Sequence, residues 1–372
     1  MTEQMSDSMY PRPEFQTQLP DFSDRGMATA TELRDFFQKR SATDPDEPIL
    51  VLRALADRGL DRLPPPGQGD TLQRWQALAA VAAQDLSLLK LYEGHTDALA
   101  ILDEIGGRDA PVEGAWNQLW GVWCAEMPNA RVELRTGEDG RQHLSGRKAW
   151  CSGAAGLTHA LVSCWNEDGE ACLAAVSLDQ PQVMVTTEGW QAVGMCGSAS
   201  VDVAFDGAVA RQIGAPGAYL ARPGFWHGGA GIAAGWYGAA AAVAGRLHAS
   251  LHGRAGKGEP NDPHRLAQLG QADIALTAAA ALLREAAAAI DRHPERDALA
   301  LALRARLAVE AAATQVLAVA TRALGAGPLC RDARFARLVA DLPVFLRQSH
   351  AERDLAALGH HLATIKDTAW TL

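Results

Sequence analysis

The sequence lacks an excess of positive charge. Its 34 Lys and Arg residues are outnumbered by 44 Asp and Glu residues, so the formal net charge at pH 7 is -10. A protein whose main partner is a nucleic acid or an anionic membrane surface needs a positively charged face. The charge balance therefore argues against both of these partners, and a neutral or small-molecule partner is easier to accommodate.

The N-terminus lacks a secretory signal. The opening MTEQMSDSMYPRPEF is polar and acidic, with no charged start followed by an apolar core, so we expect a cytoplasmic protein.

The cysteines lack the spacing of a metal site or a disulfide framework. The six cysteines include no CxxC or CxxH spacing, which fits neither a zinc site nor a small disulfide framework. We expect reduced and mostly buried thiols. His360 and His361 are adjacent without a third ligand at helical spacing, so no metal site is predicted.

The chain is too long for one ordinary core. A length of 372 residues predicts two or three packed units. Residues 1–26 are rich in Pro, Ser, Asp and Gln, which predicts a disordered N-terminal segment. Over residues 27–116 the apolar positions recur at helical spacing, as in ILVLRALADRGL, and the loop PPPGQGD interrupts them. This region is predicted to be a helical N-terminal domain.

The pattern changes between residues 117 and 223. Short runs such as ALVSCW, ACLAAVSL and VDVAF alternate with turns such as NEDGE, which is typical of an antiparallel β-sandwich or barrel. Residues 224–372 are Ala-rich, and helices predicted at 228–252, 264–291, 295–324 and 333–361 indicate a C-terminal four-helix bundle. The predicted fold class is therefore α+β multidomain, with a helical N-terminal unit, a β middle unit and the bundle.

The first predicted bundle helix carries a stripe of small residues. They recur at alternating spacings of three and four, at Gly228, Gly231, Gly235, Gly238, Ala242 and Gly245. Such a stripe allows another backbone to approach closely. The Gly spacings in GAGIAAG and LGAGPL do not follow a predicted strand inside a βαβ unit, so a dinucleotide-binding loop is not predicted.

Three segments carry a resemblance to a known family. They are LSGRKAWCSGAAGLTHALV at 144–162, VGMCGSASVDVAFDGAVA at 193–210 and LGAGPLCRDAR at 324–334. Together with the order of helices, β unit and bundle, they make the chain resemble the acyl-CoA dehydrogenase superfamily of flavoproteins from about residue 28 to residue 362. The resemblance implies FAD as cofactor, oxidation of a CH-CH bond of an acyl thioester, and a homodimer or homotetramer assembled through the bundles.

Within this resemblance, the stretch GRKAWCSGAAG implies a flavin wall. Trp150 would pack on the flavin ring, and Ser152 would place its hydroxyl near the reactive flavin nitrogen, with Cys151 between them. The backbone amides of Cys124 and Ala125 would reach the same ring. An isoalloxazine ring needs both a flat apolar wall and a polar group that tunes its electron affinity. Without the resemblance, Trp150 would more often be interpreted as a core residue.

Several positions depart from the family pattern. The place of the usual catalytic Glu holds Ala340, and the next residue, Asp341, is the candidate base, although a surface charge is the plainer interpretation. A second family location for the base, at the start of the first bundle helix, holds His227, which is the other catalytic candidate. Arg254 is the remnant of a segment that serves the cofactor of a neighbouring subunit. These losses weaken an acyl-CoA substrate more than they weaken the fold.

Two further hypotheses remain open from the sequence. The first is a flavin-dependent monooxygenase of the same fold that acts on a substrate other than a CoA ester. Arg347 and His350 in RQSHAERD lie one helical turn apart and fit a polar site of that kind, but a solvated polar face explains them equally well. The second is a flavin-free descendant that keeps the fold as a scaffold or binding protein, in line with the departures at Ala125, where the family has a Thr, and at Ala340.

Overall fold

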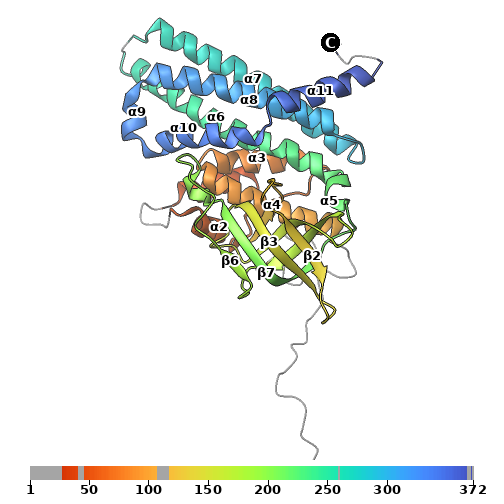
Figure 1. Ribbon diagram of the computed structural model, residues 1–372. Coiled ribbons are helices and arrows are strands. Elements are labelled where there is room, and N and C mark those ends of the chain that lie inside the picture. Colours follow the sequence, from red (N-terminus) through yellow and green to blue (C-terminus); the bar gives the residue numbers. More distant parts are fainter. Residues whose placement is uncertain (1–26, 41–45, 107–116, 259, 367–369, 371–372) are drawn as a thin grey trace, which may run out of the picture.

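The computed structural model describes residues 27–40, 46–106, 117–258, 260–366 and 370. The segment 1–26 that the sequence predicts to be disordered lies outside these residues, as do residues 107–116. Figure 1 shows the C-terminal helices on one side of the molecule, the N-terminal helices in the middle and the β unit on the other side. The mixed helical and β content and the C-terminal helical domain that the sequence predicts are therefore present.

The N-terminal unit is helical over its described residues. Its helices are α1 (Ala30–Gln38), α2 (Pro48–Ala56), α3 (Thr71–Ala82) and α4 (Leu86–Ile105). Local side chains set where they begin. Thr29 and Glu32 form a capping box at α1, and the Asp85 carboxylate accepts the Leu88 N-H at the start of α4.

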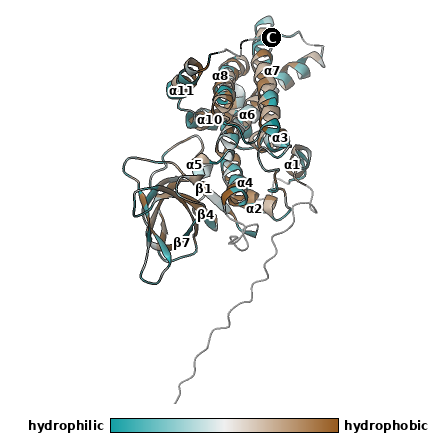
Figure 2. Cartoon of the chain, turned by 90° about the vertical axis from the view of Figure 1, so that its right-hand side faces the viewer, coloured by the Kyte–Doolittle hydropathy of each residue, from teal (hydrophilic) through white to brown (hydrophobic). Residues whose placement is uncertain are grey.

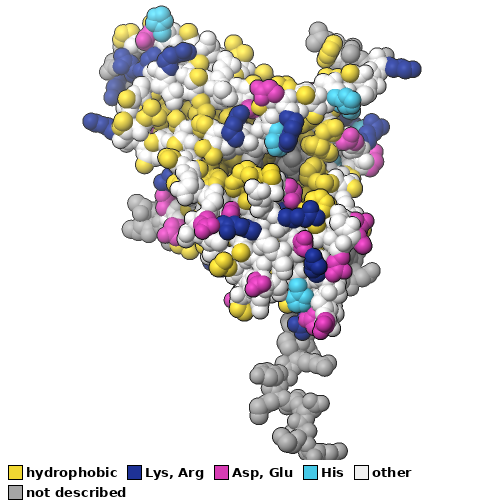
Figure 3. Space-filling view, viewed as in Figure 1, with side chains coloured by type: hydrophobic (Ala, Val, Ile, Leu, Met, Phe, Trp, Pro, Cys, Tyr) yellow, Lys and Arg dark blue, Asp and Glu magenta, His cyan; other side chains and the backbone are white. Residues whose placement is uncertain are grey.

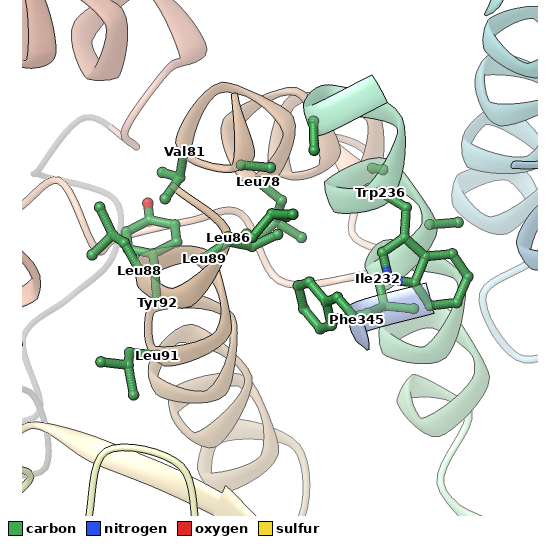
Figure 4. Packing of buried hydrophobic residues seen from close by; sticks show 14 of the residues in the cluster. Leu78, Val81, Leu86, Leu88, Leu89, Leu91, Tyr92, Ile232, Trp236 and Phe345 are labelled. Atoms are coloured by element: carbon green, nitrogen blue, oxygen red, sulfur yellow. The ribbon is translucent and has the colours of Figure 1, made fainter. Parts of the chain in front are cut away.

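Helix α4 lies between the other two units and packs on both. Near its start, Leu89 packs towards Ile232 and Trp236 of helix α6 (Gly224–Ala255), as Figure 4 shows. Near its end, Leu99 packs in a separate cluster with Trp120 of the β unit. The view in Figure 2 likewise places the β unit beside α4 and α2. Burial of apolar surface on two sides of one helix thus holds the three units together.

The middle unit is a closed barrel. Its strands are β1 (Trp120–Trp123), β2 (Val132–Thr136), β3 (Gln142–Cys151), β4 (His159–Trp165), β5 (Ala171–Ser177), β6 (Val183–Val185) and β7 (Val201–Gln212). The order β4-β2-β3-β7-β5 closes because β5 also pairs with β4. The expected antiparallel pairing is only part of the arrangement, since β4 runs parallel to both β1 and β2. Neither β1 nor β2 is joined to β4 by a hairpin. Their connections to β4 are longer, as a parallel pair of strands requires.

The C-terminal unit contains α6, α7 (Pro263–Arg292), α8 (Leu299–Leu324) and α10 (Ala333–Phe345), with short helices α5 (Ala218–Ala221) and α9 (Ala326–Arg331) before and within it. The stripe of small residues on α6 performs the predicted role. A Cβ added at Gly238 would lie 2.2 Å from the Ala79 carbonyl oxygen of α3, and one at Gly235 would lie 2.4 Å from a Leu89 methyl carbon of α4. Only glycine lets these helices approach so closely.

The single helix predicted over 333–361 is wrong. Helix α10 ends at Phe345, a 3-10 turn covers Leu346–Gln348, and α11 (Glu352–Thr364) begins a new direction. Ala351 has φ of +44°, which no right-handed helix contains. The Arg306 guanidinium of α8 donates to the Gln348 carbonyl at 2.8 Å, so a side chain satisfies a backbone group that the broken helix leaves free. His350 consequently lies at the break and not within a helix.

Candidate functional site

Trp150 stands exposed at the end of β3 on an uncommon backbone conformation. Its φ is +58°, in the left-handed region that bulky residues avoid, and 47% of its surface is exposed. Its neighbour Cys151 is fully buried, and its thiol donates to the Lys148 carbonyl at 3.3 Å. Burial raises the pKa of the Cys151 thiol, so this side chain is a packing group. The strand end thus turns a large ring outward beside a buried thiol.

Lys148, two residues before Trp150 on β3, anchors this strand through buried contacts that the sequence did not predict. Its side chain is fully buried, and its ammonium donates to Glu126 Oε1 at 2.7 Å and to Ser163 Oγ at 2.6 Å. Desolvation acts to raise the pKa of Glu126, but hydrogen bonds from Lys148 and Ser163 outweigh it and leave that pKa below its usual value. The pair ties the segment after β1 to strands β3 and β4, on either side of the Trp150 strand end.

Cys124 and Ala125 follow β1 directly and are both half-buried. Cys124 packs beside Tyr219 of α5, and burial raises the pKa of its thiol. Trp123, one residue earlier, donates its indole N-H to the Ser152 carbonyl at 3.2 Å. This bond joins the end of β1 to the loop after β3. The structure therefore brings together the two segments in which the sequence placed the flavin contacts.

Ser152 belongs to a chain of buried hydroxyl groups. Its Oγ lies 2.7 Å from Ser200 Oγ, which lies 2.9 Å from Ser198 Oγ, and Ser198 donates in turn to the Met195 carbonyl at 2.8 Å. The backbone adds a fourth tie, because the Gly153 N-H donates to the Ser198 carbonyl at 2.9 Å. The motif GSAS in the second resembling segment contains Ser198 and Ser200, but its spacing alone did not connect them to Ser152.

Asp341 points at the loop that carries these serines. Its Oδ1 accepts the Met195 N-H at 2.6 Å, its side chain is buried, and its Oδ2 has no hydrogen-bond partner among the described residues. The surface-charge interpretation is therefore wrong. Burial raises the pKa of Asp341 to about 6. Ala340 also faces this loop, since a Cβ added at Gly194 would lie 2.1 Å from its carbonyl oxygen.

His227 occupies a different environment. It is buried at the start of α6. A Cβ added at Gly67 would lie 3.1 Å from His227 Nδ1 and 3.1 Å from the Pro294 Cβ, so these three residues lie close together. Burial lowers the pKa of His227, so the imidazole is neutral at pH 7, and its Nε2 has no partner among the described residues. These neighbours come from the loop before α3 and the loop after α7. The Trp150 loop packs instead on Leu91 and Leu157.

Arg254 lies in the last turn of α6 and is exposed, and its guanidinium donates to the Pro260 carbonyl at 3.3 Å. It follows His227 by 27 positions along one helix, a distance of roughly 40 Å at the α-helical rise. One small ligand cannot contact both residues in the same chain. This placement fits the expectation that Arg254 serves a site of a neighbouring subunit, which stays a prediction.

A surface groove lies elsewhere, between α8 and α10. It has a volume of about 450 Å³ and is lined mostly by apolar side chains, among them Leu317, Ala318, Val339 and Pro343. Of the candidate residues named from the sequence, only Arg347 lines it, and none of the candidate flavin contacts does. Within the described ranges, no group of three or more His, Cys, Asp or Glu side chains is arranged to hold a metal ion.

Comparisons with known proteins identify the fold. Residues 216–346 match the family model of the acyl-CoA dehydrogenase C-terminal domain. The dibenzothiophene monooxygenase TdsC from Paenibacillus sp. A11-2, solved with FMN and indole, matches with a TM-score of 0.75 and 20% identity, over 91% of this chain and 97% of that chain. The chain therefore has an acyl-CoA dehydrogenase-like fold, and its C-terminal part is similar to the C-terminal domain of that family.

Two further relatives extend the comparison. The methanesulfinate monooxygenase MsuC from Pseudomonas fluorescens matches with a TM-score of 0.72 and 19% identity, over 91% of this chain and 97% of that chain. The amino sugar nitrososynthase DnmZ from Streptomyces peucetius is 30% identical over 178 residues, which make up 37% of this chain and 43% of that protein. The match therefore spans less than half the length of DnmZ.

Proposed function

We propose that the chain is a flavin-dependent monooxygenase that acts on a substrate other than a CoA ester. The observation that supports this proposal most directly is the burial of the Asp341 side chain and its hydrogen bond to the Met195 N-H. Dehydrogenation of an acyl thioester needs a carboxylate free to remove a proton beside the carbonyl. Here Ala340 holds the expected place of that base, and the Asp341 carboxylate is buried and bonded to the Met195 N-H. The acyl thioester chemistry that the sequence predicts thus lacks an exposed carboxylate in the place of its base.

Several residues fit a bound flavin. Trp150 offers an exposed ring that its strained backbone holds outward, and Ser152 offers a hydroxyl at the edge of a buried polar chain. When reduced, a flavin delivers two electrons to dioxygen, so that one oxygen atom enters the substrate and the other leaves as water with two protons. The residues named here would hold the ring, and the half-buried backbone at Cys124 and Ala125 would border it.

FMN is the form of flavin that we propose. The sequence resemblance implies FAD, and the family segment that serves the cofactor of a neighbouring subunit is reduced here to Arg254. FMN has no adenine half, and the structural neighbour TdsC is solved with FMN. Because FMN is the smaller cofactor, loss of a cofactor-serving segment is compatible with FMN binding. Release of the bound nucleotide by heat, followed by chromatography against FMN and FAD standards, distinguishes the two forms.

The proposed substrate is a small molecule that is oxygenated at sulfur or nitrogen. The names of the relatives support this class, since one is a dibenzothiophene monooxygenase, one a methanesulfinate monooxygenase and one an amino sugar nitrososynthase. A net charge of -10 places no anionic polymer among the expected substrates.

We also propose that two or more copies associate through the bundle. Only 22% of the most apolar 18-residue window of α7 is buried, and 33% of that of α8. By length and composition both helices could also cross a membrane, a test that bundle helices pass as well. Figure 3 shows hydrophobic side chains gathered over part of the bundle, with Lys and Arg side chains between and around them. Contact with a second copy would cover this apolar surface.

The test of the proposed function uses the full chain, reduced flavin and ¹⁸O-labelled dioxygen. We expect FMN to bind and one labelled oxygen atom to appear in dibenzothiophene, methanesulfinate or an amino sugar. The competing reaction is examined without oxygen, by adding acyl-CoA esters to the oxidised protein. Bleaching of the flavin by an acyl-CoA ester would contradict the proposal, and failure to take up any flavin would leave a scaffold or binding protein.

A further inference from the structure

The hydroxyl chain that begins at Ser152 is open at one end only. Ser198 is fully buried and Ser200 is 4% exposed, whereas Ser152 keeps 9% of its surface exposed. The far end closes on the Met195 carbonyl, which Ser198 reaches at 2.8 Å. Of the three serines, Ser152 is therefore the most accessible to a ligand.

The direction of the three protons follows from the closed end. A carbonyl oxygen has no proton, so Ser198 must donate to Met195. A hydroxyl group has one proton, so Ser198 can only accept from Ser200, which is 2.9 Å away. Ser200 has then used its own proton and accepts from Ser152 at 2.7 Å. The Ser152 proton points into the protein, and the side that faces a ligand offers lone pairs alone.

The closed end is held by its own set of contacts. The Met195 carbonyl also accepts from the Trp190 indole N-H at 3.1 Å. The Met195 backbone N-H donates to Asp341 Oδ1 at 2.6 Å. Met195 has φ of +61°, a conformation that a residue with a side chain adopts only where its surroundings impose it. Asp341 therefore fixes where the terminal carbonyl lies, and this accounts for a buried carboxylate in a helix facing a loop.

We propose that Ser198 and Ser200 are positioning residues that orient the Ser152 hydroxyl to accept a hydrogen bond from the bound flavin. This inference rests on the proposed function. A flavin ring has a nitrogen that bears a proton in the reduced form and none in the oxidised form. An accepting Ser152 bonds only the reduced form, whereas a donating Ser152 bonds the oxidised form. The serine chain thus makes the site favour reduced flavin, the form that the proposed reaction with dioxygen consumes.

Two variants break the chain at different points. Ser200→Ala removes the acceptor of the Ser152 proton, which is then free to turn towards the ligand. Ser198→Ala leaves Ser200 without its acceptor, so Ser200 can donate to Ser152 and reverse the chain. Ser87→Ala is the matched control, because Ser87 is buried and lies against the same loop, with its Oγ 3.2 Å from a Cβ added at Gly197, but is outside the chain.

The measurement is the reduction potential of the flavin bound to each variant. We expect both chain variants to have more negative potentials than wild type, equivalent to about a fivefold loss of preference for reduced over oxidised flavin. The Ser87→Ala potential should equal that of wild type. Potentials that do not move in Ser198→Ala and Ser200→Ala, in proteins that bind flavin, overturn the inference and leave the proposed function intact.

A second measurement needs no cofactor. Neutron diffraction from crystals of the deuterated full chain locates hydroxyl deuterons directly. We expect the deuteron between Ser152 and Ser200 to be attached to Ser152, and a deuteron attached to Ser200 and pointing at Ser152 overturns the inference. A wild-type chain that takes up neither FMN nor FAD overturns the proposed function and, with it, this role of the serines.

Discussion

The Asp341 carboxylate accepts the backbone N-H of Met195 at 2.6 Å and thereby joins two segments that lie 146 positions apart in the chain. One segment is the bundle helix α10, and the other is the loop that leads into β7. A residue that the sequence offers as a catalytic base is thus engaged with the backbone beside the candidate site. The bond places a titrating group where its protonation changes the stability of the fold.

The pH dependence of stability should report the buried Asp341. Desolvation, with a further contribution from Asp85, raises its pKa to about 6, against lowering by the Met195 N-H and by Arg337. The folded state therefore binds more protons than the unfolded state between pH 4 and 6. The free energy of unfolding falls as pH rises through this window, by up to about 3 kcal/mol from this group.

Asp341→Asn removes that titration and keeps an oxygen for the Met195 N-H. We expect the variant to gain stability relative to wild type as the pH is raised from 4 to 7, measured by urea unfolding at each pH. A difference between the two proteins that is constant over this range would contradict the raised pKa.

Trp150→Ala should weaken flavin binding without unfolding the protein. The ring is 47% exposed, so its removal costs little packing, whereas a stacked aromatic wall contributes about 1 to 3 kcal/mol to a flat ligand. We expect the dissociation constant for FMN to rise roughly tenfold or more in a fluorescence titration, with an unchanged melting temperature. Met184→Ala, a truncation of another exposed apolar side chain on β6, is the control and should bind as wild type does.

Gly238→Ala should destabilise the junction between α6 and α3. The new Cβ would lie 2.2 Å from the Ala79 carbonyl oxygen, a backbone atom that cannot move alone, so we expect a loss of about 1 to 3 kcal/mol in the free energy of unfolding. Gly245→Ala on the same helix meets no atom within 4 Å and should gain up to about 1 kcal/mol. Equal effects of the two substitutions in urea unfolding would refute the close approach.

Ala318→Arg tests association through the bundle. Ala318 is exposed in the groove between α8 and α10, and an added guanidinium would be buried there without a partner in any complex that covers the groove. Light scattering should show a dimer or tetramer for wild type and a smaller species for the variant. Thr136→Arg adds the same charge at an exposed position of the β unit and should leave the mass unchanged. A monomeric wild type would contradict the proposed association.

Some residues of the candidate site could be predicted from a local sequence motif, whereas the contacts between distant segments could not. Trp150, Cys151 and Ser152 are consecutive at a strand end, so a single motif identifies them together. The link from Ser152 to Ser200 spans 48 positions, and that from Lys148 to Glu126 spans 22. Each link depends on which strands become neighbours in the barrel, and strand pairing over such separations leaves no periodic signal in the chain.

Local patterns in the sequence were sufficient to predict the mixed helical and β content with a helical C-terminal part, the small-residue stripe of α6 and the turn after Trp150. These features arise from local propensity and from the spacing of apolar and small residues, which neighbouring positions express. Long-range packing was needed to establish that the barrel closes through β4 and β5, that the last long helix breaks, and that Asp341 faces Met195. In each case the deciding contact joins groups far apart in the chain, such as the Arg306 guanidinium and the Gln348 carbonyl, and its energy exists only once the units have packed.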